Sequence, residues 1–297
     1  MSKKHVHVSI ALIRQAGNIL LGWRDESLPQ GGCYEFPGGK IEQGESAEQA
    51  LHREVLEEVG ISIQIIKRFE QIYFDYSERT VTLHVYLCQP LSQDINAQWA
   101  WVALDQLHSF NFPEANQSIV QRLSWTRQLA ITTATQPVFK LKSDIKLCYL
   151  RDRTQLAQDI TELDTQQIAS IVTLSDYLQL NEQMQQKVFA IHLKSQELQR
   201  IDSLAAYENK NFIAACHHTR DIEKANLLGC DAILLSPVQM TSTHPEVRAL
   251  GWENFAELVQ KAEMPVYALG GMRQIDLAQA QQYGAYGIAG ISDFWQA

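Results

Sequence analysis

The second half of the chain carries eight short, nearly continuous apolar runs, and these constrain the fold more than any other feature. Polar stretches with helical spacing, such as residues 219–229 and 254–262, lie between several of the runs. Apolar strands that alternate with helices indicate a parallel sheet buried on both faces, and eight such units indicate a closed barrel. The runs are residues 129–133, 146–151, 168–174, 188–193, 212–216, 232–237, 265–271 and 287–292.

This barrel is short for its type. A (βα)8 barrel usually takes about 200 to 250 residues, whereas these runs are confined to residues 129–297. We therefore predict a compact α/β TIM-type (βα)8 barrel in which some helices are short or missing. We assign residues 128–297 to this second domain and residues 1–127 to a first domain.

The first domain has a different pattern, in which β-rich segments surround two helical stretches. Strands are predicted over residues 5–14, 18–24, 69–75, 80–89 and 97–102, and helices over 46–59 and 116–130. Strands that follow one another without regular helical crossovers favour an α+β arrangement, in which helices pack on a sheet.

Composition limits the partners of the chain. The formal net charge of −9 and the pI of about 5.5 argue against a nucleic-acid polymer or an anionic membrane as a general partner. The sequence shows neither a signal peptide nor an apolar run of the roughly 18 residues that a membrane span needs. The five cysteines are scattered and lack C-x-x-C spacing, which is typical of reduced thiols. We expect a cytoplasmic protein.

The helix predicted over residues 46–59 is strongly acidic. Ser46 and Gln49 form a capping box at its start, and Gly60 suits the position that follows its last turn. Three glutamates at i, i+3 and i+4 share one face and repel one another; they are Glu54, Glu57 and Glu58. Either this is a solvated acidic face, or the carboxylates bind a divalent cation such as Mg²⁺.

The segment from Gly39 to Ile61 decides between these two readings. It follows G-x5-E-x7-R-E-V-x-E-E-x-G-I, which resembles the Nudix box with all nine defining positions filled. The resemblance implies a Nudix hydrolase, with a mixed sheet and helices, that uses Mg²⁺ or Mn²⁺ and an attacking water to cleave a nucleoside diphosphate linked to another group. It implies a catalytic set of Glu54, Glu57 and Arg53 and a metal site of Gly38, Glu54, Glu57 and Glu58. Glu54 or Glu57 then orients and deprotonates the water.

The flanking segments EFPGGK (35–40), SERTVTLHVYL (77–87) and FNFPEANQSIV (110–120) resemble the MutT-like 8-oxo-dGTP diphosphatases. The resemblance implies a nucleoside triphosphate substrate and a binding set of Arg24, Phe36, Arg79 and Asn116, in which Asn116 hydrogen-bonds the oxidised guanine. Each residue also has an ordinary structural role open to it. Asn116 could cap the following helix, the two arginines could be surface charges, and Phe36 could be a core aromatic.

One position departs from this subfamily. Its members usually carry a glutamate before a tryptophan-containing strand, whereas Gln98 stands there in this chain. An amide binds cations weakly and cannot accept a proton at neutral pH. The identity of the general base is therefore open.

The second half resembles the thiamine phosphate synthase/TenI barrels in the segments AIHLKSQEL (190–198), PVYALGGM (265–272) and GIAGIS (287–292). The resemblance implies a phosphorylated ligand held by backbone amides of the last two strand–helix loops. The residues implied are Gly270, Gly271, Gly290 and Ser292.

Several synthase positions are altered in this half. Tyr149 stands where the family has glutamine, Glu197 where it has an aspartate, and the lysine of the T-x-T-K motif is lost at 241–244. We therefore expect a barrel that is degenerate as a synthase. Two alternatives to the leading hypothesis remain: hydrolysis of thiamine diphosphate analogues or another thiamine-related step, and a barrel that serves as a non-catalytic sensor or scaffold.

Overall fold

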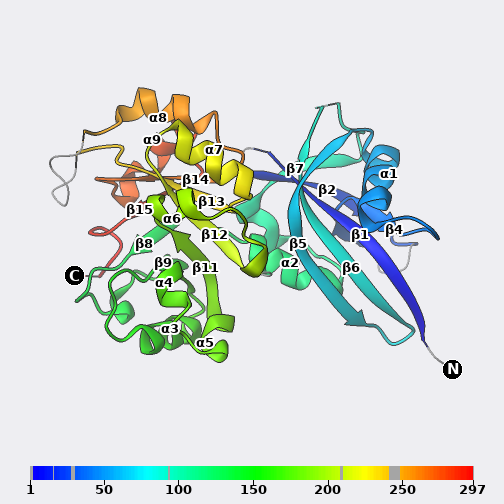
Figure 1. The fold of residues 1–297 in the computed structure, drawn as a ribbon, viewed down its shortest axis with the longest axis horizontal. Coiled ribbons are helices and arrows are strands. Elements are labelled where there is room, and N and C mark those ends of the chain that lie inside the picture. The colour runs from blue at the N-terminus through cyan, green and yellow to red at the C-terminus, as the bar shows by residue number, and fades with distance from the viewer. Residues whose placement is uncertain are drawn as a thin grey trace. The chain divides into compact units, whose positions relative to one another are not determined.

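The computed structural model describes residues 3–15, 17–27, 31–92, 94–207, 210–240 and 248–296. The chain divides into two compact units, residues 1–124 and residues 125–297 (Figure 1). None of the helices in the described ranges is long and apolar enough to cross a bilayer.

The N-terminal unit is built on a mixed sheet. The strands are β1 (Lys4–Gln15), β2 (Asn18–Arg24), β3 (Cys33–Glu35), β4 (Gly38–Lys40), β5 (Ile63–Asp75), β6 (Arg79–Pro90) and β7 (Trp99–Ala103). Their order is β3-β2-β1-β6-β5, with β4 paired to β1 and β7 paired to β2. Strands β1 and β6 run parallel, whereas the other pairs are antiparallel. The predicted α+β class is confirmed, although the sequence pattern did not reveal β3 and β4.

Helix α1 (Ala47–Val59) matches its prediction closely. The Ser46 hydroxyl accepts a hydrogen bond from the Gln49 amide, the Gln49 side chain bonds back to Ser46, and Gly60 is left-handed with φ 84°. The buried face of the helix packs on residues from β1, β2, β6 and β7. This packing leaves the acidic face toward β4.

The helix predicted over residues 116–130 is wrong in its length. The segment forms a 3₁₀ turn η2 (Glu114–Asn116) and helix α2 (Gln117–Leu123), and strand β8 begins at Gln128. A preceding 3₁₀ turn, η1, covers Leu104–Ser109. Trp125 is fully buried against Phe189 within the second unit, so it contributes an apolar residue at helical spacing without being helical.

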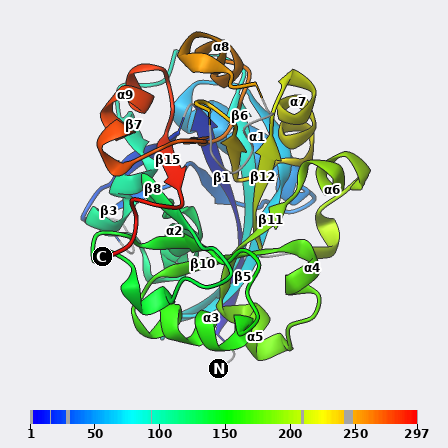
Figure 2. The same ribbon diagram turned by 90° about the vertical axis from the view of Figure 1, so that its left-hand side faces the viewer.

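The C-terminal unit is a closed barrel of eight parallel strands, as predicted. The strands are β8 (Gln128–Ile131), β9 (Leu147–Tyr149), β10 (Ala169–Thr173), β11 (Val188–Leu193), β12 (Asn211–Cys216), β13 (Ala232–Leu235), β14 (Val266–Leu269) and β15 (Gly287–Gly290). Strand β15 pairs with β8 and closes the barrel. Figure 2 shows the helices arranged around these strands.

The small size of the barrel comes from its connections. Its helices are α3 (Leu156–Thr165), α4 (Leu174–Tyr177), α5 (Glu182–Lys187), α6 (Ser195–Arg200), α7 (Thr219–Leu228), α8 (Gly251–Val259) and α9 (Leu277–Gln282). Three 3₁₀ turns are η3 (Val138–Lys140), η4 (Ala205–Tyr207) and η5 (Gln274–Asp276). Between β8 and β9 the chain makes only the turn η3, so the expectation of short or missing helices is confirmed.

Candidate active site

Arg53 organises the acidic face of helix α1. Its guanidinium donates two hydrogen bonds to the Glu45 carboxylate, at 2.8 and 2.9 Å, and one to Glu54 Oε1 at 2.9 Å. It also reaches Glu57 Oε2 at 3.4 Å and the carbonyl oxygen of Lys40 at 3.2 Å. The hydrogen bonds from Arg53 lower the pKa of Glu45 to about 2, and the carboxylates raise the pKa of Arg53 in return. One cation therefore ties the loop before the helix to two of its glutamates.

Glu58 lies apart from this network, against strand β4. Its Oε2 accepts a hydrogen bond from the Gly38 amide at 3.2 Å. Burial raises the pKa of the Glu58 carboxyl to about 7, the negative charges of Glu35 and Glu54 add to the rise, and the Gly38 amide and Arg24 oppose it. The site thus holds more negative charge than its own cations balance.

The glycine pair of β4 allows the helix to approach the strand. Gly38 has φ 141°, and a Cβ atom there would lie 2.1 Å from the Ser9 carbonyl oxygen. A Cβ atom on Gly39 would lie 2.2 Å from Cδ of Glu54. Ser9 on β1 also donates a hydrogen bond from its hydroxyl to the carbonyl of Ala47, at the start of α1. Only glycine at both positions permits this arrangement.

The donor set suits a hard divalent cation. Carboxylates are the ligands that Mg²⁺ and Mn²⁺ prefer. Glu58 is partly buried beside the negative charges of Glu35 and Glu54, and a cation would offset both its burial and this repulsion. In the ranges that the structure describes, no three His, Cys, Asp or Glu side chains already converge as a ligand set. Glu57 stays largely exposed, with 60% of its side chain accessible, and among the residues that the structure describes it bonds Arg53 alone. Of the predicted residues, the structure brings Gly38, Glu54 and Glu58 together and leaves Glu57 at the rim.

Gln98 anchors the end of the acidic helix. Its side-chain amide donates to the main-chain carbonyl of Glu58 at 3.3 Å. Asn96 and Trp99 donate to the same oxygen, at 2.9 and 3.0 Å. Three donors on one carbonyl fix the backbone of Glu58, so Gln98 supports the helix in this structure.

Arg24 reaches the acidic site through a residue that the sequence did not single out. Its Nη1 donates to Glu35 Oε2 at 2.7 Å, with both side chains partly buried. Strands β2 and β3 pair Arg24 with Cys33 and Gly22 with Glu35, which places both ends of this ion pair on neighbouring strands. Glu35 lies near enough to raise the pKa of Glu58. Arg24 is therefore not an isolated surface charge.

Two stacked phenylalanines adjoin the acidic site, and one of them precedes its glycine pair in the sequence. Phe36 is 4% exposed and stacks on Phe112, with ring centroids 5.2 Å apart. Phe36 also comes directly between Glu35 and the glycine pair of β4. The stack thus joins strand β3 to the segment that leads into η2.

Tyr76 contacts Arg79 and the residue before Asn116, and the sequence pattern did not single it out. The Arg79 guanidinium lies 5.9 Å from the centroid of the Tyr76 ring. The Tyr76 hydroxyl accepts a hydrogen bond from the amide of Ala115, the neighbour of Asn116. The one sequence signal for this contact is that Tyr76 stands three positions before Arg79.

Asn116 itself is 6% exposed and lies inside the turn η2. Its backbone amide bonds the carbonyl of Pro113. Within the described chain, its side-chain amide makes no bond to helix α2, so the capping role considered for it is not observed. Asn116 is therefore a buried polar residue that does not cap its own helix.

The barrel residues predicted to hold phosphate lie at the ends of two adjacent strands. Gly270 and Gly271 follow β14 and have φ values of 105° and 72°. Gly290 ends β15, where a Cβ atom would lie 2.3 Å from the ring of Phe294, and the exposed Ser292 follows two residues later. Strands β14 and β15 are paired, so the two glycine segments are neighbours. The segment 241–247, which includes the altered T-x-T-K motif, lies outside the described residues.

A buried pair fills part of the barrel mouth. The Tyr149 hydroxyl and His192 Nδ1 are 3.1 Å apart, and their ring centroids are 4.6 Å apart. Burial lowers the pKa of His192 to about 3, and the positive charges of Lys194 and Arg151 add to the effect. Burial also raises the pKa of Tyr149, so both groups are neutral near pH 7.

The fold and the acidic site define a two-domain enzyme, in which an acidic-helix hydrolase domain is followed by a closed barrel of eight parallel strands. Residues 9–122 match the NUDIX domain family, and residues 138–294 match the thiamine monophosphate synthase family. The chain belongs to both families, one in each domain. It is a Nudix hydrolase fused to a thiamine monophosphate synthase-type barrel.

Relatives of each domain agree with this assignment. The 8-oxo-dGTP diphosphatase of Escherichia coli (strain K12) is 33% identical over 126 residues, which cover 40% of this chain and 97% of that protein. The enzyme of the same name from Haemophilus influenzae is 34% identical over 129 residues, covering 41% of this chain and 94% of the relative. A candidate thiamine-phosphate synthase of Aquifex aeolicus (strain VF5) is 31% identical over 160 residues, covering 52% of this chain and 85% of the relative.

Proposed function

We propose that the N-terminal domain hydrolyses 8-oxo-dGTP to 8-oxo-dGMP and diphosphate, with Mg²⁺ as the cation and Mn²⁺ as a substitute. The observation that carries the proposal is the buried Asn116 amide, which is not used by its own helix and follows the Phe36–Phe112 stack. A side-chain amide offers both a donor and an acceptor to the edge of a base. The relatives named above as 8-oxo-dGTP diphosphatases support the same substrate.

The residues divide into a nucleoside group and a phosphate group. In the nucleoside group, Asn116 would hydrogen-bond the oxidised base, Phe36 would supply an apolar wall, and Arg79, held beside Tyr76, would contact the nucleotide. Arg24 would contact the nucleotide from the other side while it keeps Glu35 in place. Burial of the Asn116 side chain makes the site selective among bases. A base that cannot hydrogen-bond the amide leaves it without a partner.

Among the residues assigned to the phosphates, Glu54, Glu57 and Glu58 would hold the cation, with Gly38 beside them. When bound, the cation neutralises charge on the phosphate chain and makes a coordinated water more acidic. Glu54 or Glu57 orients the attacking water and takes its proton, while Arg53 holds Glu54 and Glu45 in position. A bond forms between the water oxygen and phosphorus, the anhydride bond between the α- and β-phosphates breaks, and the products separate as the monophosphate and diphosphate.

The test is diphosphate release from 8-oxo-dGTP in the presence of Mg²⁺, with wild type, Glu57→Gln and the matched control Glu48→Gln. Glu48 is an exposed residue of the same helix, which keeps the control close in charge and position. We expect Glu57→Gln to lose about 100-fold or more of the activity and Glu48→Gln to retain it. Brisk turnover of thiamine diphosphate analogues with little turnover of 8-oxo-dGTP would overturn the proposed substrate.

For the barrel, we propose that it binds the phosphate of a small ligand without acting as a thiamine phosphate synthase. Support for binding comes from the adjacent glycine segments after β14 and β15. Support for lost synthesis comes from Tyr149, which replaces a family glutamine and is bonded to His192. A sensor or scaffold is the role that fits both observations.

Titration of the full chain with thiamine phosphate and with inorganic phosphate tests this role. A Cβ atom on Gly271 would lie 3.0 Å from Gln239 Cβ, so Gly271→Ala should weaken binding. Gly284→Ala is the control, since Gly284 also has a positive φ and lies in the turn between α9 and the start of β15, whereas the glycine segments follow the ends of β14 and β15. Synthesis of thiamine phosphate by the wild-type chain would contradict the proposal.

A further inference from the structure

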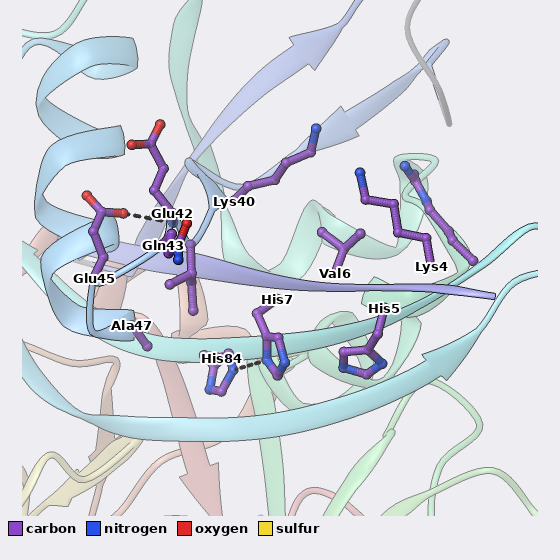
Figure 3. Close-up of a pocket in the computed structure, with 12 residues that line it drawn as sticks. Lys4, His5, Val6, His7, Lys40, Glu42, Gln43, Glu45, Ala47 and His84 are labelled. Carbon is purple, nitrogen blue, oxygen red and sulfur yellow. Dashed lines mark hydrogen bonds between the residues drawn. The ribbon is translucent and has the colours of Figure 1, made fainter. Parts of the chain in front are cut away.

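Three histidines of the N-terminal unit lie together on one face of its sheet, and neither proposed role uses them (Figure 3). His5 and His7 belong to β1, whereas His84 belongs to β6 and is the register partner of Ser9. Because side chains alternate along a strand, residues 5, 7 and 9 of β1 and residue 84 of β6 project to the same face. Ser9 bonds the Ala47 carbonyl at the start of α1, so this is the face on which the helix packs.

His7 and His84 form a close pair. His7 Nδ1 and His84 Nε2 are 3.2 Å apart, as the dashed line in Figure 3 marks, and the two ring planes are inclined by 29°. Two nitrogens bound to one tetrahedral Zn²⁺ lie about 3.3 Å apart when each Zn–N bond is about 2.0 to 2.1 Å long. The observed separation therefore suits two imidazoles that share a metal ion as well as two that share a proton.

His5 limits how far the His7 ring can turn. The His5 ring lies edge-on to His7, with centroids 4.7 Å apart, and it stacks on Tyr73 with centroids 5.8 Å apart. The hydroxyls of Thr80 and Thr82 contact its two nitrogens, at 2.7 and 3.0 Å. His5 is therefore held at both nitrogens, and it serves as a wall beside His7 and not as a further ligand. Side chains that are held in place before a ligand arrives lose less entropy on binding it.

The pair joins two parallel strands at the place where helix α1 is anchored. His84 is the register partner of Ser9, and His7 stands two residues before Ser9 on β1. The Ser9 hydroxyl donates to the Ala47 carbonyl at 2.6 Å. An ion bound by both imidazoles would thus fix β1 to β6 beside the first turn of α1.

The donor set of the pair differs from that of the acidic site. Imidazole nitrogens suit Zn²⁺, Cu²⁺ and Ni²⁺, whereas the carboxylates of α1 suit Mg²⁺ and Mn²⁺. His7 is exposed and His84 is partly exposed, so water can complete the coordination. Within the ranges that the structure describes, no third His, Cys, Asp or Glu joins the pair. Arg68 is close enough to act electrostatically on His84, and its positive charge makes the site weaker than a structural zinc centre with four protein ligands.

We propose that His7 and His84 bind a transition-metal ion, with Zn²⁺ as the principal ligand, at a site separate from the carboxylates of helix α1. His7 Nδ1 and His84 Nε2 supply the two protein ligands, and water molecules supply the others. The bound ion joins β1 to β6 and stabilises the folded N-terminal unit. The inference does not depend on the substrate of the hydrolase, because neither histidine belongs to the proposed nucleoside group or phosphate group.

Calorimetric titration of the full chain with Zn²⁺ tests this site, in buffer that contains excess Mg²⁺ to occupy the carboxylates. Loss of an outer-shell partner alone costs about 10- to 100-fold in metal affinity. His7→Gln and His84→Gln each remove a ligand, so each should weaken Zn²⁺ binding about tenfold or more. His52→Gln is the matched control, because His52 is an exposed histidine of α1. Glu58→Gln should also leave this binding unchanged, which separates it from the acidic site.

Thermal unfolding in EDTA shows that each variant is folded before it is titrated. Added Zn²⁺ should raise the melting temperature of wild type and of His52→Gln, but not of His7→Gln or His84→Gln, because a ligand that binds only the folded state stabilises it. Two results would overturn the site: wild type that binds no Zn²⁺ in excess Mg²⁺, or variants of the pair that bind it as tightly as wild type does. Either result would leave His7 and His84 as a pair that shares only a proton.

Discussion

Gly39 and Glu54 are in such close contact that a Cβ atom on residue 39 would lie 2.2 Å from the carboxyl carbon of Glu54. This contact brings the acidic helix α1 onto the short strand β4. Residue 39 must therefore be glycine because of its contact with Glu54, and not because of its own backbone angle.

Substitution Gly39→Ala should therefore displace the Glu54 carboxylate. A shift of about 1 Å in a catalytic group can cost about 100-fold in rate, and we expect kcat to fall by this order while the domain remains folded. Steady-state kinetics and thermal unfolding measure the two effects. Gly44→Ala is the control, because a Cβ atom there meets nothing within 4 Å although φ is 91°. A Gly39→Ala enzyme with normal kcat would show that the position of Glu54 is unimportant.

The Glu58 carboxylate should lower the stability of the folded, metal-free protein. This carboxylate is partly buried beside the negative charges of Glu35 and Glu54, so Glu58→Gln should raise the melting temperature in EDTA at pH 8 by about 4 °C for each 1 kcal/mol relieved. The same variant should lose most of the stabilisation that Mg²⁺ gives to wild type. Scanning fluorimetry with and without Mg²⁺ checks both effects. Unchanged stabilisation by Mg²⁺ would remove Glu58 from the metal site.

Gln98 should matter little for the chemical step. Asn96 and Trp99 bond the same Glu58 carbonyl at shorter distances, so loss of the Gln98 bond leaves the helix end anchored. We expect Gln98→Ala to lower kcat by no more than about threefold and to cost about 0.5 to 1.5 kcal/mol of stability. A loss of about 100-fold in kcat would instead place Gln98 in the reaction itself.

The barrel should lose stability on mild acidification because of His192. Its pKa is lowered to about 3 in the folded chain, against about 6.5 when unfolded. The unfolded state therefore gains a proton first, and the stability that is present above pH 6.5 is lost as the pH falls toward 3. Between pH 7 and pH 5 the loss amounts to about 2 kcal/mol. Urea unfolding of wild type and His192→Gln should show this slope in wild type alone; parallel curves would refute it.

Much of the fold was predictable because local sequence patterns encode its helices and strands. The capping box of Ser46 and the left-handed Gly60 fixed both ends of α1, and the eight apolar runs marked the eight barrel strands. Strand β4 carries two glycines and a lysine, so it has no hydrophobic pattern to detect. The segment 116–130 failed for the opposite reason, since Trp125 supplies helical periodicity but packs in the barrel.

The candidate site was predictable only where a motif names its residues. Glu54 and Glu58 could be placed on one helix from their spacing, and the structure adds the strand that they contact. Glu35 and Tyr76 join the site through strand pairing and a bond to a distant turn, at sequence separations that local patterns do not encode.

The central claim is that Asn116 reads an oxidised guanine. The most direct measurement is the ratio of kcat/KM for 8-oxo-dGTP to that for dGTP, in wild type and in Asn116→Ala, with Mg²⁺ present. We predict a wild-type ratio of about 100 or more that falls toward one in the variant, because the buried amide no longer distinguishes the bases. Equal turnover of the two nucleotides by wild type, or the same high ratio in the variant, would contradict the account.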